Sequence, residues 1–180
     1  DAWGNRVSWC QIVERHERLT IEAESLVHVA GQSFDDRDTS GSWGTVASAR
    51  YQNTLAEFIL PSHLVAWSDA TRRFAETVAV AETTDVVVWA RMLAMRLRER
   101  LSYERGATDV TTTVDAVIAA GRGVCQDFAH VFVALCRMRG VAARYVSGWL
   151  YEPDRDGPVE SHAWAELSVP GAGCIEEYPT

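Results

Sequence analysis

The stretch GRGVCQDFAH, residues 121–130, places a cysteine directly after a glycine-containing turn and at the start of a segment with helical spacing. Before it, Thr113 is placed to cap a short helix, VDAVIAA, which Gly121 would end. After it, apolar residues recur every three or four positions as far as Arg139, and Gly140 follows. The pattern therefore predicts a helix over residues 125–139 whose first residue is Cys125.

One face of this predicted helix is apolar, and Cys125 lies at its N-terminal end. The other residues of that face are Phe128, Ala129, Phe132, Leu135 and Cys136. The free N–H groups and dipole of a helix N-terminus favour the thiolate form of a cysteine and suit the binding of an oxyanion. Asp127 would disfavour the thiolate if it pointed inward. A cysteine on an apolar face is more often a small packing residue than a nucleophile, so position alone leaves both roles open.

The segments around this helix predict an α+β domain. TDVVVWARMLAMRLRERLSY, residues 84–103, has the spacing of a long amphipathic helix. Three candidate strands follow residue 140: ARYVSGWLY (143–151), SHAWAELSV (161–169) and GCIEEYPT (173–180). Helices followed by antiparallel strands indicate a helix packed on an antiparallel sheet. Residues 5–29 alternate as strands do, and residues 43–50 favour a short helix.

Composition excludes several classes of function. The chain has 180 residues, 47% of them hydrophobic, and a net charge of −8, which gives no positive field for nucleic acid. No apolar run is long enough to span a bilayer, so we expect no membrane partner and a cytoplasmic protein. The four cysteines show no metal-binding spacing, and no glycine-rich or acidic loop indicates a cofactor, so we expect reduced thiols, no metal and no cofactor.

A thiolate nucleophile needs a base within hydrogen-bond reach. His130 lies five residues along the same helix, about 140° away in projection, and should not reach Cys125. His162 opens the second candidate strand, where a sheet packed on the helix would bring it toward the thiol, although a histidine there can equally be structural. The last strand supplies the nearest acids, Glu176 and Glu177, followed by Tyr178.

The segments GVCQDFAH, ARYVSGWL and SHAW, in this order and spacing, resemble the transglutaminase-like superfamily of bacterial and archaeal proteins. The resemblance is strong over residues 84–180. It implies a papain-like core, in which a cysteine heading the central helix meets a histidine and an aspartate on adjacent strands. It also implies that residues 1–60 are the C-terminal part of a β-rich N-terminal domain, that 61–83 connect it to the core, and that the natural chain extends beyond both ends.

The resemblance assigns the nucleophile to Cys125 and the general base to His162. The family's closing motif, Gly-Trp-x-x-x-Asp-Pro-Thr, reads GCIEEYPT here, so that Cys174 replaces the tryptophan and Tyr178 the aspartate. A neutral phenol can accept a hydrogen bond from an imidazole but adds no negative charge. A glutamate can substitute by a shift in register, and Glu176 is favoured over Glu177 because it shares strand parity with Tyr178.

The function implied is cysteine-dependent acyl transfer on amide bonds through a thioester. Hydrolysis of a peptide or isopeptide is the first expectation and transfer to an amine the second, and in both the partner is a protein or peptide substrate. The alternative is a catalytically impaired module that binds a protein or peptide in the same cleft.

Overall fold

The computed structural model describes residues 7–22, 41–81, 83–149 and 161–180, and the chain divides into two compact units, Asp1–Ser33 and Phe34–Thr180. In the first unit, residues 7–22 contain no helix or strand and all their side chains are exposed. The strands expected over 5–29 are therefore absent from this described part, and residues 5, 6 and 23–29 lie outside it. Leu19 and Ile21, 52% and 78% exposed, alternate without burying a face.

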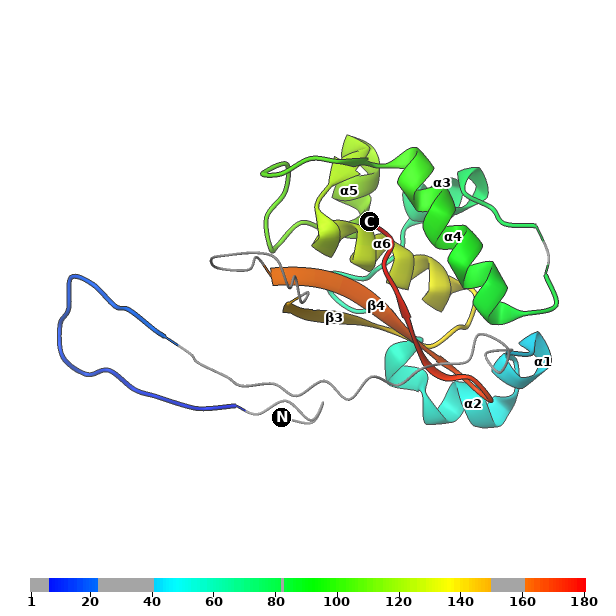
Figure 1. Cartoon of the computed structure of the whole chain (residues 1–180), viewed down its shortest axis with the longest axis horizontal. Coiled ribbons are helices and arrows are strands. Elements are labelled where there is room, and N and C mark those ends of the chain that lie inside the picture. Colours follow the sequence, from blue (N-terminus) through cyan, green and yellow to red (C-terminus); the bar gives the residue numbers. More distant parts are fainter. Residues whose placement is uncertain (1–6, 23–40, 82, 150–160) are drawn as a thin grey trace, which may run out of the picture. The chain divides into compact units, whose positions relative to one another are not determined.

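The second unit consists of helices and an antiparallel sheet (Figure 1). The helices are α1 (Trp43–Val46), α2 (Ala49–Thr54), the 3₁₀ helix η1 (Ala56–Phe58), α3 (Asp69–Thr77), α4 (Val86–Arg100), α5 (Val114–Ala120) and α6 (Cys125–Met138). The sheet strands are β3 (Ala143–Trp149), β4 (Ser161–Val169) and β5 (Gly173–Glu177), in the order β3-β4-β5. Two residues each form β1 (Ser102–Tyr103) and β2 (Arg122–Gly123), which pair in parallel. The expected α+β class is confirmed.

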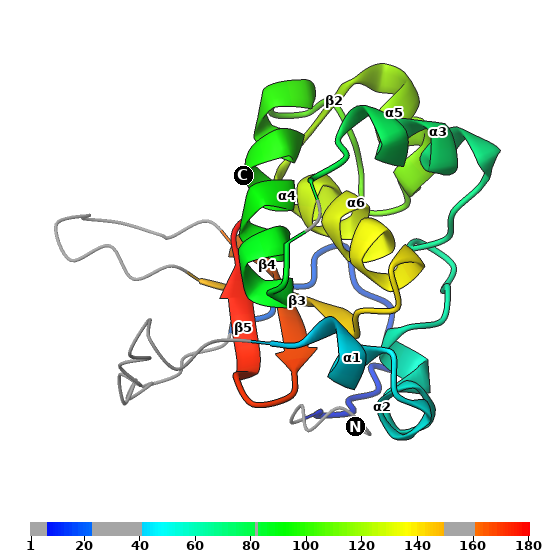
Figure 2. The same ribbon diagram turned by 90° about the vertical axis from the view of Figure 1, so that its right-hand side faces the viewer.

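Helix α6 is the centre of the core. It packs on β4 and β3, with α4, α5 and β2 also against it (Figures 1 and 2). The inward residues of β4 are small or aliphatic, Ala163, Ala165 and Leu167, and all are buried. Because α6 is covered on several sides, its residues from Asp127 to Arg137 are all buried, including polar ones. This packing fixes the position of the helix start, where Cys125 lies.

The local signals that predicted α5 and α6 are present as expected. The Thr113 side chain accepts a hydrogen bond from the Ala116 N–H, and Gly121 ends α5 in the left-handed conformation at φ 67°. Gly140 follows α6 with φ 75°, a conformation that disfavours residues with a Cβ. The turn through residues 121–124 therefore delivers the chain from one helix directly to the start of the next.

The segment before α4 is more structured than expected. Helix α3 lies within residues 61–83, which were predicted as a connection, and its Ser68 cap and Thr71 both donate hydrogen bonds to Asp115 of α5. Residues 43–58 are helical, and Val46 and Tyr51 belong to the buried core. The assignment of residues 1–60 to a β-rich domain stays a prediction. Across the four described ranges, no helix combines the length and the apolar character needed to cross a membrane.

Candidate active site

The start of α6 is held by the side chain of Asp127. This carboxylate is fully buried, and its Oδ2 accepts hydrogen bonds from the Val124 N–H at 2.7 Å and from the Thr108 hydroxyl. A Cβ on Gly123 would lie 2.6 Å from that oxygen, so the turn needs glycine at this point. Asp127 thus fixes the residue before Cys125 and ties the 106–112 loop to the helix, which orients the cysteine.

Cys125 and His162 are brought to the same open pocket. Cys125 is the first residue of α6, and His162 is the second residue of β4, opposite Gly148 of β3. Both side chains are partly exposed. The pocket is lined by Val124, Cys125, Gln126, Tyr145, Ser147, Ser161, His162 and Ala163. Although they are 37 residues apart in sequence, the two residues therefore face one solvent-accessible space, as their proposed roles require. We predict that the thiol of Cys125 and the imidazole of His162 lie within about 4 Å of each other.

Tyr178, at the position of the family aspartate, stacks against His162 instead of accepting a hydrogen bond in its plane. The centroids of the His162 and Tyr178 rings are 6.1 Å apart with an interplanar angle of 16°. The Trp164 ring also stacks on Tyr178, with the ring centroids 5.8 Å apart. The Tyr178 hydroxyl donates to Glu176 Oε2 at 3.0 Å. Burial and this hydrogen bond raise the pKa of Tyr178 to about 12, so the phenol is neutral and supplies no charge to the imidazole.

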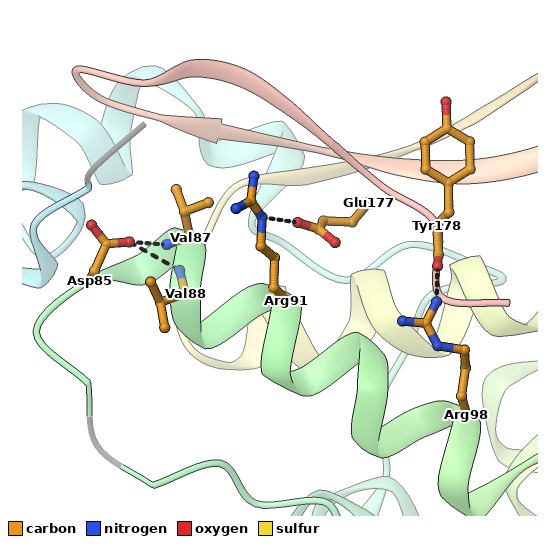
Figure 3. Close-up of polar contacts among 7 residues, drawn as sticks. All are labelled: Asp85, Val87, Val88, Arg91, Arg98, Glu177 and Tyr178. Carbon is orange, nitrogen blue, oxygen red and sulfur yellow. Dashed lines mark hydrogen bonds and ion pairs between the residues drawn. The ribbon is translucent and has the colours of Figure 1, made fainter. Parts of the chain in front are cut away.

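The alternation of β5 separates its two glutamates. Glu177 is buried and points toward α4, where its carboxylate lies 3.5 Å from the Arg91 guanidinium, while the Tyr178 ring points away from α4 (Figure 3). Arg98 of α4 donates to the Tyr178 carbonyl at 2.7 Å, which fixes the strand end (Figure 3). Glu176 and Tyr178 share the opposite side, as the strand parity predicted. Between the described side chains no hydrogen bond joins His162 to Glu176, Glu177 or Tyr178.

Two further residues near the site were not identified from the sequence as functional. Tyr145 of β3 lines the pocket, and its ring lies 4.8 Å from the ring of His130. His130 is buried behind the pocket and does not line it, in agreement with its projected angle on α6. Burial lowers the pKa of His130, Asp127 opposes that shift and Arg137 adds to it. The strand alternation in ARYVSGW places Tyr145 toward the helix, but nothing in the sequence marks it as facing a pocket.

The other thiols differ from Cys125 in exposure. Cys136 is fully buried within α6, and burial raises its pKa well above the ordinary value for a thiol. Cys174 is exposed on β5, and Cys10 is exposed in the first unit. Cys125 alone among these four combines partial exposure with a place at a helix start and in the pocket.

Solved structures of known proteins share this fold. A candidate cysteine protease from Cytophaga hutchinsonii superposes with a TM-score of 0.64 and 23% identity, over 81% of this chain and 47% of that one. The periplasmic domain of TgpA from Pseudomonas aeruginosa, in its ethylmercury-bound crystal structure, gives a TM-score of 0.52 and 23% identity, over 71% of this chain and 49% of that one. At this level of identity the likeness shows the fold, which is the papain-like one expected from the sequence.

Sequence relatives are found in mycobacteria. The uncharacterized protein Rv2569c of Mycobacterium tuberculosis is 35% identical over 180 residues, and the uncharacterized protein ML0607 of Mycobacterium leprae is 30% identical over 178. The alignments cover 94% and 95% of this chain, which spans 57% and 62% of the length of these relatives. The family model of the transglutaminase-like superfamily matches residues 72–178, which include Cys125, His162 and Tyr178. The chain therefore belongs to the transglutaminase-like superfamily.

Proposed function

We propose that this protein carries out cysteine-dependent acyl transfer on amide bonds, with Cys125 as nucleophile and His162 as general base. The observation that carries the proposal is the shared pocket: the cysteine that begins α6 and the histidine at the second position of β4 line one open space. Membership of the transglutaminase-like superfamily supports the same two residues at the same motif positions.

The reaction follows from the chemistry of these two groups. His162 takes the thiol proton, and the thiolate of Cys125 adds to the amide carbonyl carbon, forming a C–S bond and an oxyanion. When the C–N bond breaks, the imidazolium gives its proton to the departing amine and a thioester remains. Water or a second amine then attacks the thioester and releases Cys125. Peptide or isopeptide hydrolysis is the first choice and amine transfer the second.

A second candidate is a binding module that has lost catalysis. The observation that favours it is Tyr178, whose neutral ring stacks on His162 while its hydroxyl serves Glu176. An imidazole without an anionic partner is poorly oriented, and its protonated form is poorly stabilised. Such a protein would bind a peptide in the pocket without forming a thioester.

Intact-mass measurement after mixing the protein with a panel of glutamine-containing peptides and peptide amides distinguishes these candidates. We expect a mass increase equal to the acyl group, located on Cys125 by peptide mapping and absent in Cys125→Ala. The matched control is Cys174→Ser, which removes an exposed thiol outside the pocket and should acylate like the wild type. Binding of peptide with no acyl adduct and no released amine would replace catalysis by the binding-module function.

A further inference from the structure

The pocket contains a phenol that the proposed reaction has not used. Tyr145 lies on β3 opposite Ala165 of β4, and Ser147 lies opposite Ala163. Because Ala163 and Ala165 are buried beneath α6, this register places Tyr145 on the helix side of the sheet, beneath the start of α6. Tyr145 is half-buried and lines the pocket with Cys125 and His162. Its hydroxyl is thus carried by a strand that is paired along its length with β4.

We propose that the Tyr145 hydroxyl donates a hydrogen bond to the oxyanion formed when Cys125 attacks an amide carbonyl. The inference rests on the proposed function and adds to Cys125 and His162 a third catalytic residue that contacts the reacting atoms. The addition moves the carbonyl π electrons onto oxygen, and the oxyanion binds the N–H at the start of α6 and the Tyr145 O–H. The phenol keeps its proton throughout, and the electron pair returns to the carbonyl when the C–N bond breaks.

The electrostatic surroundings keep Tyr145 in the donor form. Burial raises the pKa of Tyr145, and negative charge on Cys125 and on Asp127 raises it further. A hydrogen bond with the Ser147 side chain opposes this rise. The Tyr145 and Cys125 side chains both line the same pocket. A neutral phenol carries an O–H that can donate to a substrate atom in the pocket.

The remaining polar side chains of the pocket fit this role less well. Gln126 follows Cys125 directly, but its side-chain amide donates to the Asp109 carbonyl at 3.3 Å and so helps to hold the loop. Ser147 and Ser161 are exposed to solvent, where a hydrogen bond to an oxyanion contributes less. Tyr145 is half-buried in the pocket wall, and its ring lies against that of His130.

Comparison of two reactions of the same thiol tests the proposal. Amide acylation passes through an oxyanion, whereas alkylation by iodoacetamide displaces iodide at a saturated carbon and forms none. Tyr145→Phe keeps the ring and its contact with His130, and removes only the hydroxyl. In a Cys10→Ser/Cys174→Ser background, we expect Tyr145→Phe to lower the rate of Cys125 acylation about 10²- to 10³-fold, the size of a lost oxyanion donor. The alkylation rate of Cys125 should not change.

The matched control is Tyr103→Phe, which removes the hydroxyl of a tyrosine that is 53% exposed and outside the pocket, and should leave both rates unchanged. Thermal unfolding of each variant checks that the fold is retained. Wild-type acylation in Tyr145→Phe would overturn the inference while leaving the proposed function intact. So would a parallel change of both rates, because Tyr145 would then act on the thiol. Failure of the wild type to acylate with any amide would overturn the proposed function itself.

Discussion

At the scale of single residues, the two cysteines of α6 share one helix but differ in exposure to solvent. Cys125 is partly exposed at the helix start, and Cys136 is fully buried with a raised pKa. In the Cys10→Ser/Cys174→Ser background, iodoacetamide at pH 7 should alkylate Cys125 about ten times faster than Cys136, or more. The reason is that the thiolate is the reactive species and must be accessible. Mass mapping of quenched samples gives both rates. Equal rates in the native protein would remove the case for an activated Cys125.

Tyr178 provides the second test at this scale. We expect Tyr178→Asp to raise amidase activity about 10- to 1,000-fold, because a carboxylate can orient His162 and stabilise its protonated form. Since Glu176 lies beside this position and would repel a new carboxylate, Tyr178→Asp/Glu176→Gln should be at least as active. Tyr178→Phe is the control and should give no increase. Loss of turnover in Glu176→Gln alone would instead identify Glu176 as the acid already in use.

Some residues of the site could be predicted from the sequence and others could not. Cys125 and His162 were predicted because their motifs are local, and the parity of Glu176 with Tyr178 followed from strand alternation. Tyr145 was not predicted as a pocket residue, because its role depends on how β3 lies beneath α6, which is a long-range relation. The stacking of Tyr178 on His162 was missed for the same reason: the motif gives a position, and the side-chain geometry depends on Trp164 and Glu176 around it.

At the scale of elements, the sequence predicted the helices and strands whose residue pattern shows an apolar face that becomes buried. Helices α4, α5 and α6 and strands β3, β4 and β5 were all expected, with β3 described as far as Trp149. Helix α3 was missed because its sequence, DATRRFAET, is mostly polar, although its Ser68 cap was a usable signal. The pair β1–β2 has two residues in each strand, too few for any periodicity. In residues 7–22 apolar and polar residues alternate, but no neighbouring strand within the described ranges pairs with this segment, and it forms no strand.

Asp127 should decide the stability of the start of α6. Asp127→Ala removes the acceptor of two hydrogen bonds, from the Val124 N–H and the Thr108 hydroxyl, and leaves the former without its partner. We expect a loss of about 1.5–3 kcal/mol of unfolding free energy, typical for hydrogen bonds to a charged group. Asp127→Asn keeps one acceptor oxygen and should lose less. Denaturant unfolding measures both, and wild-type stability of Asp127→Ala would contradict this role.

Glu177 should make the contact between β5 and α4 sensitive to pH. Burial raises the pKa of Glu177 above its ordinary value, although Arg91 partly opposes the shift. A carboxyl whose pKa is higher in the folded state contributes stability that is fully present below the unfolded pKa of about 4.5 and is lost as pH rises through the folded value. Relative to Glu177→Gln, the wild type should therefore lose stability from about pH 4.5 upward. Unfolding free energies at several pH values test this, and a difference independent of pH would contradict it.

At the scale of the second unit, its N-terminal helices are bound into the core by hydrogen bonds to distant backbone. The Tyr51 hydroxyl donates to the Ser168 carbonyl at 2.7 Å and accepts from the Ala142 N–H at 2.8 Å. Gln52 donates to the Gly140 carbonyl, and the Arg137 guanidinium donates to the Leu60 carbonyl, each at 2.8 Å. These contacts connect residues 51–60 to the turn after α6 and to the sheet. They support an extension of the functional unit well before residue 84.

A truncation series tests where that unit begins. A chain of residues 34–180 retains Tyr51 and Gln52, whereas a chain of residues 61–180 leaves the Ala142 N–H and the Ser168 and Gly140 carbonyls without these partners and removes Val46 and Tyr51 from the core. Each unmet buried polar group costs about 1–3 kcal/mol, so the combined loss approaches the whole stability of a small domain. We expect chain 34–180 to melt cooperatively by circular dichroism and chain 61–180 not to. Tyr51→Phe in chain 34–180 should lower the melting temperature without abolishing folding. Cooperative melting of chain 61–180 at the same temperature would show instead that the core begins after the first helices, as the sequence pattern suggested.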